Sequence, residues 1–185
     1  MKTKQFLVVL TVVVLGAGTP QCSAQGLPQP TPEHKAMARE AGNWKAVSKL
    51  WLTPETEPMI SEASESNTLL GELWLLSEYE GNVMGMPFKG MGTMGYDPVK
   101  KKYVGTWVDT INPHLQTMEG EYDVATHTLT MYSTGRDVMT SEEKTSKLVS
   151  RYLDDNSKVF EMHALVPGKT DEYWKQMEVT YKRAD

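Results

Sequence analysis

The chain has 185 residues, a formal net charge of −5 at pH 7 and a single cysteine, Cys22. This length is enough for one domain with a substantial core, and an acidic balance with scattered basic residues argues against nucleic acid or an anionic membrane surface as a partner. We therefore predict no nucleic-acid partner, while the oligomeric state stays unknown at this level.

The N-terminus has the pattern of a secretory signal peptide. Lys2 and Lys4 precede an apolar run at residues 6–15, and small and polar residues follow up to Ala24. The run is far shorter than the roughly 20 residues that span a bilayer. We predict a signal peptide at 1–24, cleaved after Ala24, an exported protein that is periplasmic or secreted, and no integral membrane segment in the mature chain. A retained anchor and a lipid anchor on Cys22 are the alternatives.

Cleavage would remove the only cysteine, so the mature protein has neither disulfides nor thiol chemistry and depends on packing for its stability.

Residues 25–32 are proline-rich and predict a short extended leader. Thr31 and Pro32 then predict a helix start, because threonine caps helices and proline suits the first helical position. The helix is expected to begin at Pro32 and to continue through His34–Ala41, which contains only fair to good helix formers, and Gly42 stops it. A single domain is predicted for residues 33–185.

From Trp44 onward the pattern predicts short strands separated by turn residues. The expected strands are 43–52, 58–66, 69–79, 84–95, 102–110, 114–123, 127–134, 143–153, 158–166 and 172–183. The expected breaks include Asn67, Glu80-Gly81-Asn82, Asp97-Pro98 and Thr134-Gly135. No segment is long enough for crossover helices, so we predict an all-β fold: a single antiparallel up-and-down β-barrel of about ten strands, lipocalin-like, with a short N-terminal helix. A two-layer sandwich is the alternative.

Two features anchor this prediction. Read with a period of two, the stretch from Tyr103 to Asp109 places Tyr103, Gly105, Trp107 and Asp109 on one face of a strand. In a closed barrel the first and last strands are neighbours, so a cation from Lys182-Arg183 is expected over the Trp44 ring, contributing about 0.5–2 kcal/mol.

Several motifs together resemble one family over most of the mature chain. They are Gly42-Asn43-Trp44, Gly85-Met86-Pro87-Phe88-Lys89-Gly90, Gly95-Tyr96-Asp97, Tyr103 to Asp109, the Arg151 strand with Phe160-Glu161, and Met177 to Arg183. The set resembles the DUF1579 domain family, a bacterial group whose function is unassigned. The resemblance implies a lipocalin-like barrel and no particular activity. His163, where an aromatic residue is expected, and Pro113-His114 depart from the family pattern.

A barrel of this size encloses space, and glycines on its strands widen it. We predict that it binds a small, mostly apolar ligand in its lumen, oriented by a few polar groups. The predicted ligand-binding residues are Trp44, Tyr96, Tyr103, Trp107, Asp109, Tyr122, Glu161 and His163. No catalytic residue, metal or cofactor is assigned.

Three alternatives stay open. In an enzyme, Glu161 with His163, or Asp109, would act as acid and base. In a haem or copper barrel, His163 or His114 would be an axial ligand, or thioethers would hold Cu(I). The methionines concerned are Met84, Met86, Met91, Met94, Met118 and Met131. In a protein-interaction domain the outer surface would matter more than the lumen.

Overall fold

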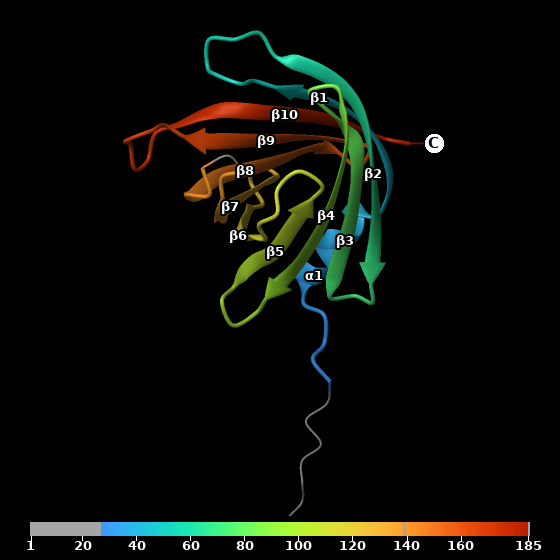
Figure 1. Ribbon diagram of the computed structural model, residues 1–185. Coiled ribbons are helices and arrows are strands. Elements are labelled where there is room, and N and C mark those ends of the chain that lie inside the picture. Colours follow the sequence, from blue (N-terminus) through green and yellow to red (C-terminus); the bar gives the residue numbers. More distant parts are fainter. Residues whose placement is uncertain (1–26, 139, 185) are drawn as a thin grey trace, which may run out of the picture.

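The computed structural model describes residues 27–138 and 140–184, which form a closed antiparallel barrel with a short helix at one end (Figure 1). The elements are α1 (Pro32–Ala36), the 3-10 turn η1 (Met37–Glu40), β1 (Gly42–Leu50), β2 (Met59–Leu70), β3 (Trp74–Val83), β4 (Met86–Asp97), β5 (Lys102–Asp109), β6 (Gln116–Asp123), β7 (Thr128–Arg136), β8 (Glu143–Asp154), β9 (Ser157–Leu165) and β10 (Tyr173–Arg183). Each strand pairs with the next along the chain, and β1 pairs with β10. The predicted fold class is confirmed. The predicted signal peptide and its cleavage site lie outside the described residues.

The N-terminal helix begins and ends where the sequence predicts. Pro32 occupies the first turn, and the backbone N–H of Thr31 donates to Nδ1 of His34 over 3.1 Å. The α-helical part is short, and the remaining predicted residues form the 3-10 turn η1. Gly42 ends the segment with a φ of 115°, a conformation that glycine adopts without steric cost.

Three predicted turns are wrong, because the residues concerned lie inside strands. Asn67 is in β2, Glu80-Gly81-Asn82 is in β3, and Thr134-Gly135 is in β7. The hairpin between β3 and β4 instead turns at Met84 and Gly85, whose φ values of 55° and 81° suit a two-residue connection. In all three cases the turn comes later in the chain than the local turn chemistry predicts.

Asn67 shows why a residue typical of turns can be kept within a strand. Its side chain is buried on the inner face of β2, where Nδ2 donates to the carbonyl of Glu40 over 3.1 Å and to Oε1 of Glu65 over 2.7 Å. These bonds connect the barrel wall to η1, so the amide serves as a tertiary contact and does not form a turn.

Alternate residues face the interior, where two hydrophobic clusters form. One, at the helix-capped end, is built around Met37, Tyr103, Leu129 and Met131. The other is built around Trp44, Ala46, Val179 and Tyr181, and Ala63, Tyr79, Phe160 and Met177 pack against it. The first cluster draws on the neighbouring strands β4–β8 and the second on β9, β10, β1, β2 and β3, so the two clusters fix which face of each strand points inward.

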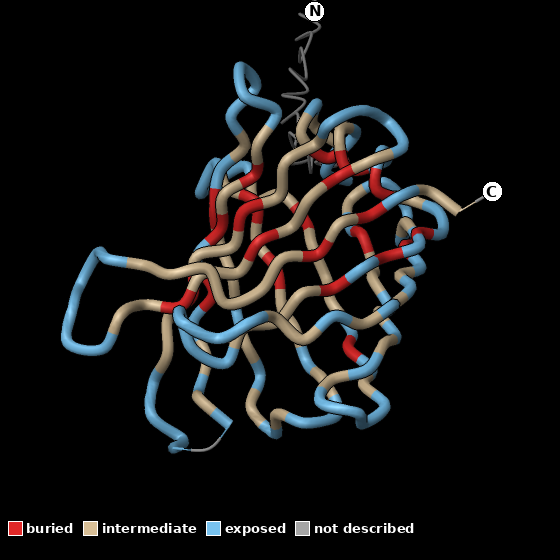
Figure 2. Tube along the Cα trace, turned by 90° about the horizontal axis from the view of Figure 1, so that it is seen from above, coloured by how far each residue is buried: buried red, intermediate tan, exposed pale blue. Residues whose placement is uncertain are grey.

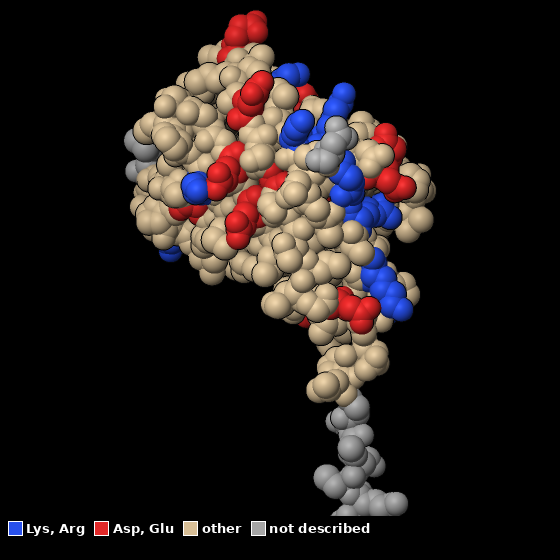
Figure 3. Space-filling model, turned by 90° about the vertical axis from the view of Figure 1, so that its right-hand side faces the viewer, with Lys and Arg blue, Asp and Glu red and all other residues tan. Residues whose placement is uncertain are grey.

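The outer surface carries charges of both signs. On the face shown in Figure 3, lysine and arginine side chains lie in a line along one side, beside separate acidic groups. Cross-strand neighbours on the outer face include Lys45 and Lys182, which lie opposite one another in β1 and β10.

Within residues 27–138 and 140–184, no helix combines the length and the apolar character that crossing a membrane would require.

Candidate functional site

The helix-capped end of the barrel is closed by a stack of rings and cations centred on Trp44. The guanidinium carbon of Arg183 lies 4.3 Å from the centre of the Trp44 ring, which confirms the cation predicted from the last strand. The ammonium of Lys158 lies 4.8 Å from the same ring. Nε1 of Trp44 donates to the Glu40 carbonyl over 2.9 Å. Arg183 also donates to the carbonyl of Ala41 over 2.7 Å, so the C-terminal strand holds the end of the helical segment in place.

A buried ion cluster lies directly behind this stack. The Lys158 ammonium pairs with Glu40 and, over 3.1 Å, with Glu65, and the three side chains are only 9%, 6% and 11% exposed. Burial opposes the charged form of Lys158, but the charges of Glu40 and Glu65 and their hydrogen bonds outweigh it and raise the pKa. Burial, together with the Glu65 charge, raises the pKa of Tyr181 well above its ordinary value. The cluster therefore closes this end of the barrel with buried charges that are paired with one another.

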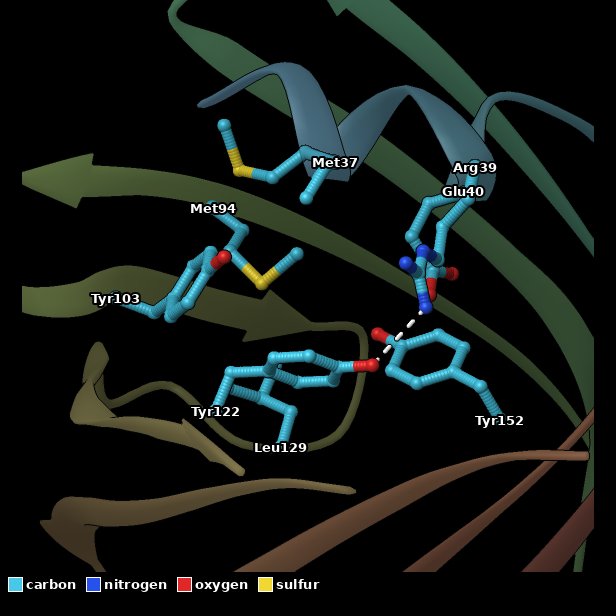
Figure 4. A pocket seen from close by; sticks show the side chains of 9 residues that line it. Met37, Arg39, Glu40, Met94, Tyr103, Tyr122, Leu129 and Tyr152 are labelled. Atoms are coloured by element: carbon cyan, nitrogen blue, oxygen red, sulfur yellow. Dashed lines mark hydrogen bonds between the residues drawn. The ribbon is translucent and has the colours of Figure 1, made fainter. Parts of the chain in front are cut away.

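Beneath the helix the space is filled by aromatic and methionine side chains. Figure 4 shows that Met37, Met94, Tyr103, Tyr122 and Tyr152 turn toward one another there. The remaining cavity measures about 20 Å³, which is room for little more than one water molecule. Burial raises the pKa of Tyr103 to about 12, so this phenol stays neutral. Three of the predicted ligand-binding residues, Tyr96, Tyr103 and Tyr122, lie in or beside this packed layer.

The opposite end of the lumen is more open. At the capped end the inward-facing Trp44, Val179 and Tyr181 are 3%, 1% and 5% exposed. Toward the other end several inward-facing side chains are half-buried, while Ser133, Ser146 and Ala164 stay buried, and Met86 at the rim is 53% exposed. The half-buried positions include Leu50, Met59, Phe88, Trp107, Met162 and Met177. Figure 2 shows the buried positions in the middle of the barrel and toward the N-terminal segment, with exposed loops at both ends.

Trp107 and Asp109 lie together on the inner face of this open half, as their alternation predicts. Nε1 of Trp107 donates to Oδ2 of Asp109 over 3.0 Å. The other carboxylate oxygen, Oδ1, accepts from the backbone N–H groups of Ile111 and Asn112 over 3.0 and 2.8 Å. Asp109 is thus occupied in holding the indole and the following loop, which leaves it poorly placed to act as a base.

Glu161 and His163 lie on the outer face of the barrel. Their neighbours Phe160 and Met162 face the interior, so the alternation of β9 turns Glu161 and His163 outward. Arg151 binds Glu161 through two bonds of 3.0 Å, and Nε2 of His163 lies 3.1 Å from Oε2 of Glu161. The hydrogen bonds from Arg151 hold the pKa of Glu161 down to about 2. Such a carboxylate is a weak proton acceptor at neutral pH.

We expect Glu161→Gln to lower the free energy of unfolding at pH 7 by about 1–3 kcal/mol. Because the folded pKa of about 2 lies below the ordinary value of 4.5, the carboxylate contributes stability above about pH 4.5 and loses it as the pH falls toward 2. The difference between wild type and variant in urea unfolding should therefore shrink from pH 5 to pH 2.5. Glu80→Gln, in an exposed pair with Lys89, is the control and should cost little. A difference independent of pH would contradict this prediction.

The residues considered for metals and haem do not converge. Met94, Met118 and Met131 pack in the helix-capped core, whereas Met84, Met86 and Met91 are exposed. His114 lines a shallow groove of about 380 Å³ at the rim of the open end, between the loop after β5 and the strands β7 and β8. In the part of the chain that the structure describes, no three His, Cys, Asp or Glu side chains are grouped as metal ligands.

The buried ion cluster was not predicted from the sequence. On β9 the residues that face inward are Lys158, Phe160, Met162 and Ala164. A lysine on the same strand face as three apolar residues indicates a buried charge that must be paired. Its partners, Glu40 and Glu65, come from η1 and β2 and had no comparable signal. Gly90 and Gly92, which lie under the Trp107 ring, were also not recognised as a support for that side chain.

Comparisons with known proteins agree with the fold. The model of the DUF1579 family, described as a protein of unknown function, matches residues 29–183. The crystal structure of Rv2717c from M. tuberculosis is similar, with a TM-score of 0.63 and 12% identity over 85% of this chain and all of that one. The S-type phycobiliprotein lyase CPES from Guillardia theta has a TM-score of 0.52 and 9% identity, over 83% of this chain and 93% of that one. No curated protein matches the chain. Identities this low show a shared fold alone.

Proposed function

The chain belongs to the DUF1579 family, and from its geometry we propose that it is an exported barrel that binds a small, mostly apolar molecule in the open half of its lumen. The observation that carries this proposal is the change in exposure along the barrel. Inward-facing side chains are sealed at the capped end, as Val179 is at 1% exposure, and several of those toward the other end are accessible. A solvent-accessible inner surface with a closed floor is the form that barrel binding sites take.

The chemistry of the inner surface favours an apolar ligand. Phe88, Trp107, Met162 and Met177 are half-buried on it, and methionine adapts to ligands of varied shape. Uncharged polar groups that can orient a ligand also face this part of the lumen, among them the half-buried Gln116, whose Oε1 accepts from the hydroxyl of the buried Ser133 over 3.3 Å. The ligand would enter past the loops at the uncapped end.

Titration with an uncharged environment-sensitive dye tests the proposal. We expect the wild-type protein to bind the dye saturably and Phe88→Arg to weaken binding at least about tenfold, since a charge would enter the apolar lumen. Met91→Arg on the same strand is the matched control, because Met91 is on the outer face and 56% exposed. Folding of each variant is checked by circular dichroism. A folded wild-type protein that binds no apolar dye, and that carries no small molecule in native mass spectra, would refute the proposal.

Export is tested separately. N-terminal sequencing of the protein from its natural host should find a mature chain starting at Gln25 in the fraction outside the cytoplasm. An intact N-terminus on protein recovered from the cytoplasm would contradict export while leaving the binding proposal standing.

A further inference from the structure

The Trp107 ring has an unusual support in the open half of the lumen. A Cβ atom added to Gly90 would lie 2.5 Å from Cη2 of the indole, and one added to Gly92 would lie 3.2 Å from Cε3. Both glycines are on β4, directly beside β5, with Gly92 opposite Trp107 in the register. Because opposite edges of the same ring approach the two glycines, the indole lies flat across the backbone of β4. A side chain at either position would push it into the lumen.

The ring is also held in this orientation. Asp109 accepts the indole N–H over 3.0 Å, and Asp109 is itself fixed by the backbone N–H of Asn112 over 2.8 Å. One face of the indole is covered by β4, so the other face points into the barrel. Among the described residues no aromatic ring or cation is stacked on that face, and Trp107 remains half-buried. The lumen therefore contains a flat, pre-positioned aromatic surface.

The charges near this surface are already paired. Asp109 has three hydrogen-bond donors, and the inward-facing Lys144 lies 3.6 Å from Oδ2 of Asp137 at the rim. The buried ion cluster of Lys158, Glu40 and Glu65 lies below the floor. A charged ligand would lose its hydration without gaining an unpaired counter-charge, which disfavours its binding.

We propose that the exposed face of Trp107 is a stacking surface for an uncharged, planar aromatic ligand. This inference rests on the proposed function and narrows it to a class of ligand. Aromatic rings stack in offset or edge-on geometries and gain energy beyond the burial of their area, so a rigid indole on a flat backbone selects planar molecules over flexible chains.

The chain provides a matched control on its outer surface. Trp74 also lies over a glycine, because a Cβ on Gly95 would lie 2.6 Å from Cε3 of its indole. Trp74 is 41% exposed and faces away from the lumen, since it alternates with the buried, inward-facing Leu75. Both tryptophans therefore rest on a glycine of β4, one inside the barrel and one outside.

The test compares pyrene, pyrenesulfonate and dodecanol as probes of the full-length mature protein. We expect the wild-type protein to bind pyrene, and to bind pyrenesulfonate at least about tenfold more weakly. Trp107→Leu should reduce the affinity for pyrene about tenfold. The same substitution should change the affinity for dodecanol less than about threefold. Trp107→Phe, which keeps a smaller ring, should give an intermediate affinity, and Trp74→Leu should match wild type. In the wild-type protein, pyrene should shift the indole N–H resonance of Trp107 and leave that of Trp74 unchanged.

The outcomes separate the two proposals. If dodecanol binds but Trp107→Leu leaves pyrene affinity unchanged, or pyrene leaves the Trp107 resonance in place, stacking is refuted and the binding barrel stands. Equal affinities for pyrene and pyrenesulfonate would refute the preference for uncharged ligands. If the folded wild-type protein binds none of the three probes, both proposals fail.

Discussion

Replacing Lys158 by Met is expected to lower the free energy of unfolding by about 3–5 kcal/mol, because it leaves two buried carboxylates without their cation. Glu40 and Glu65 are 6% and 11% exposed on their side chains, and both pair with Lys158. The Trp44 and Tyr181 rings, 4.8 and 4.5 Å from the ammonium, would lose this contact as well, and Trp44 would keep only the Arg183 guanidinium. Water cannot readily replace these contacts at a sealed end.

Urea unfolding at pH 7 measures this effect. Adding Glu65→Gln to the variant should recover part of the stability at pH 7. Lys102→Met is the control: its pair with Glu119 is 35% and 45% exposed, so its loss should stay within about 1 kcal/mol. Equal losses for the two lysines would show that the cluster contributes no more than a surface pair.

Gly120→Ala is expected to be similarly damaging, with a loss of roughly 3 kcal/mol or more. A Cβ at Gly120 would overlap the carbonyl oxygen of Thr130 and lie 2.5 Å from Cα of Met131. Both atoms belong to the backbone of β7, which cannot move aside without breaking its own pairing with β6 and β8. The glycine is needed for close approach of two strands, which is a common reason for glycine within a sheet.

The comparison is thermal or urea unfolding of Gly120→Ala against Thr117→Ala. Thr117 is on the same strand and exposed, so its replacement should change stability by about 0.5 kcal/mol or less. Failure of the glycine variant to fold, with the threonine variant native, also agrees with the prediction. Two variants of equal stability would show that β7 can yield at this point.

The sequence was sufficient to predict the fold because the strands repeat at short intervals and the two ends carry complementary groups. Trp44 and Arg183 lie opposite one another in the β1–β10 register, as barrel closure requires. The inward face of β5 was also predicted, since Tyr103, Gly105 and Trp107 alternate cleanly with Val104 and Thr106.

The site was harder to predict because side chains on both faces of the strands are polar. On β9, Lys158 faces inward and Glu161 faces outward, so charge alone does not identify the solvent side. Asn67 and Gly81, read locally as turn residues, are set by tertiary contacts: Asn67 bonds to the Glu40 carbonyl, and a Cβ at Gly81 would lie 3.0 Å from Cβ of Ala63 on β2. Such contacts join residues far apart in the chain and leave no local pattern.

The pairing of the first strand with the last has a consequence during biosynthesis. Every other pair of neighbouring strands is consecutive in the chain, but β1 also pairs with β10, the strand farthest from it in the sequence, and this pair can form only after β10 has been made. Until then the nascent chain is an open sheet with bare backbone groups along one edge, the kind of surface that pairs with other chains. The Arg183 bonds that secure the end of the helical segment also form only at this last step. A chain truncated within β10 should therefore keep the edge of β1 bare and aggregate.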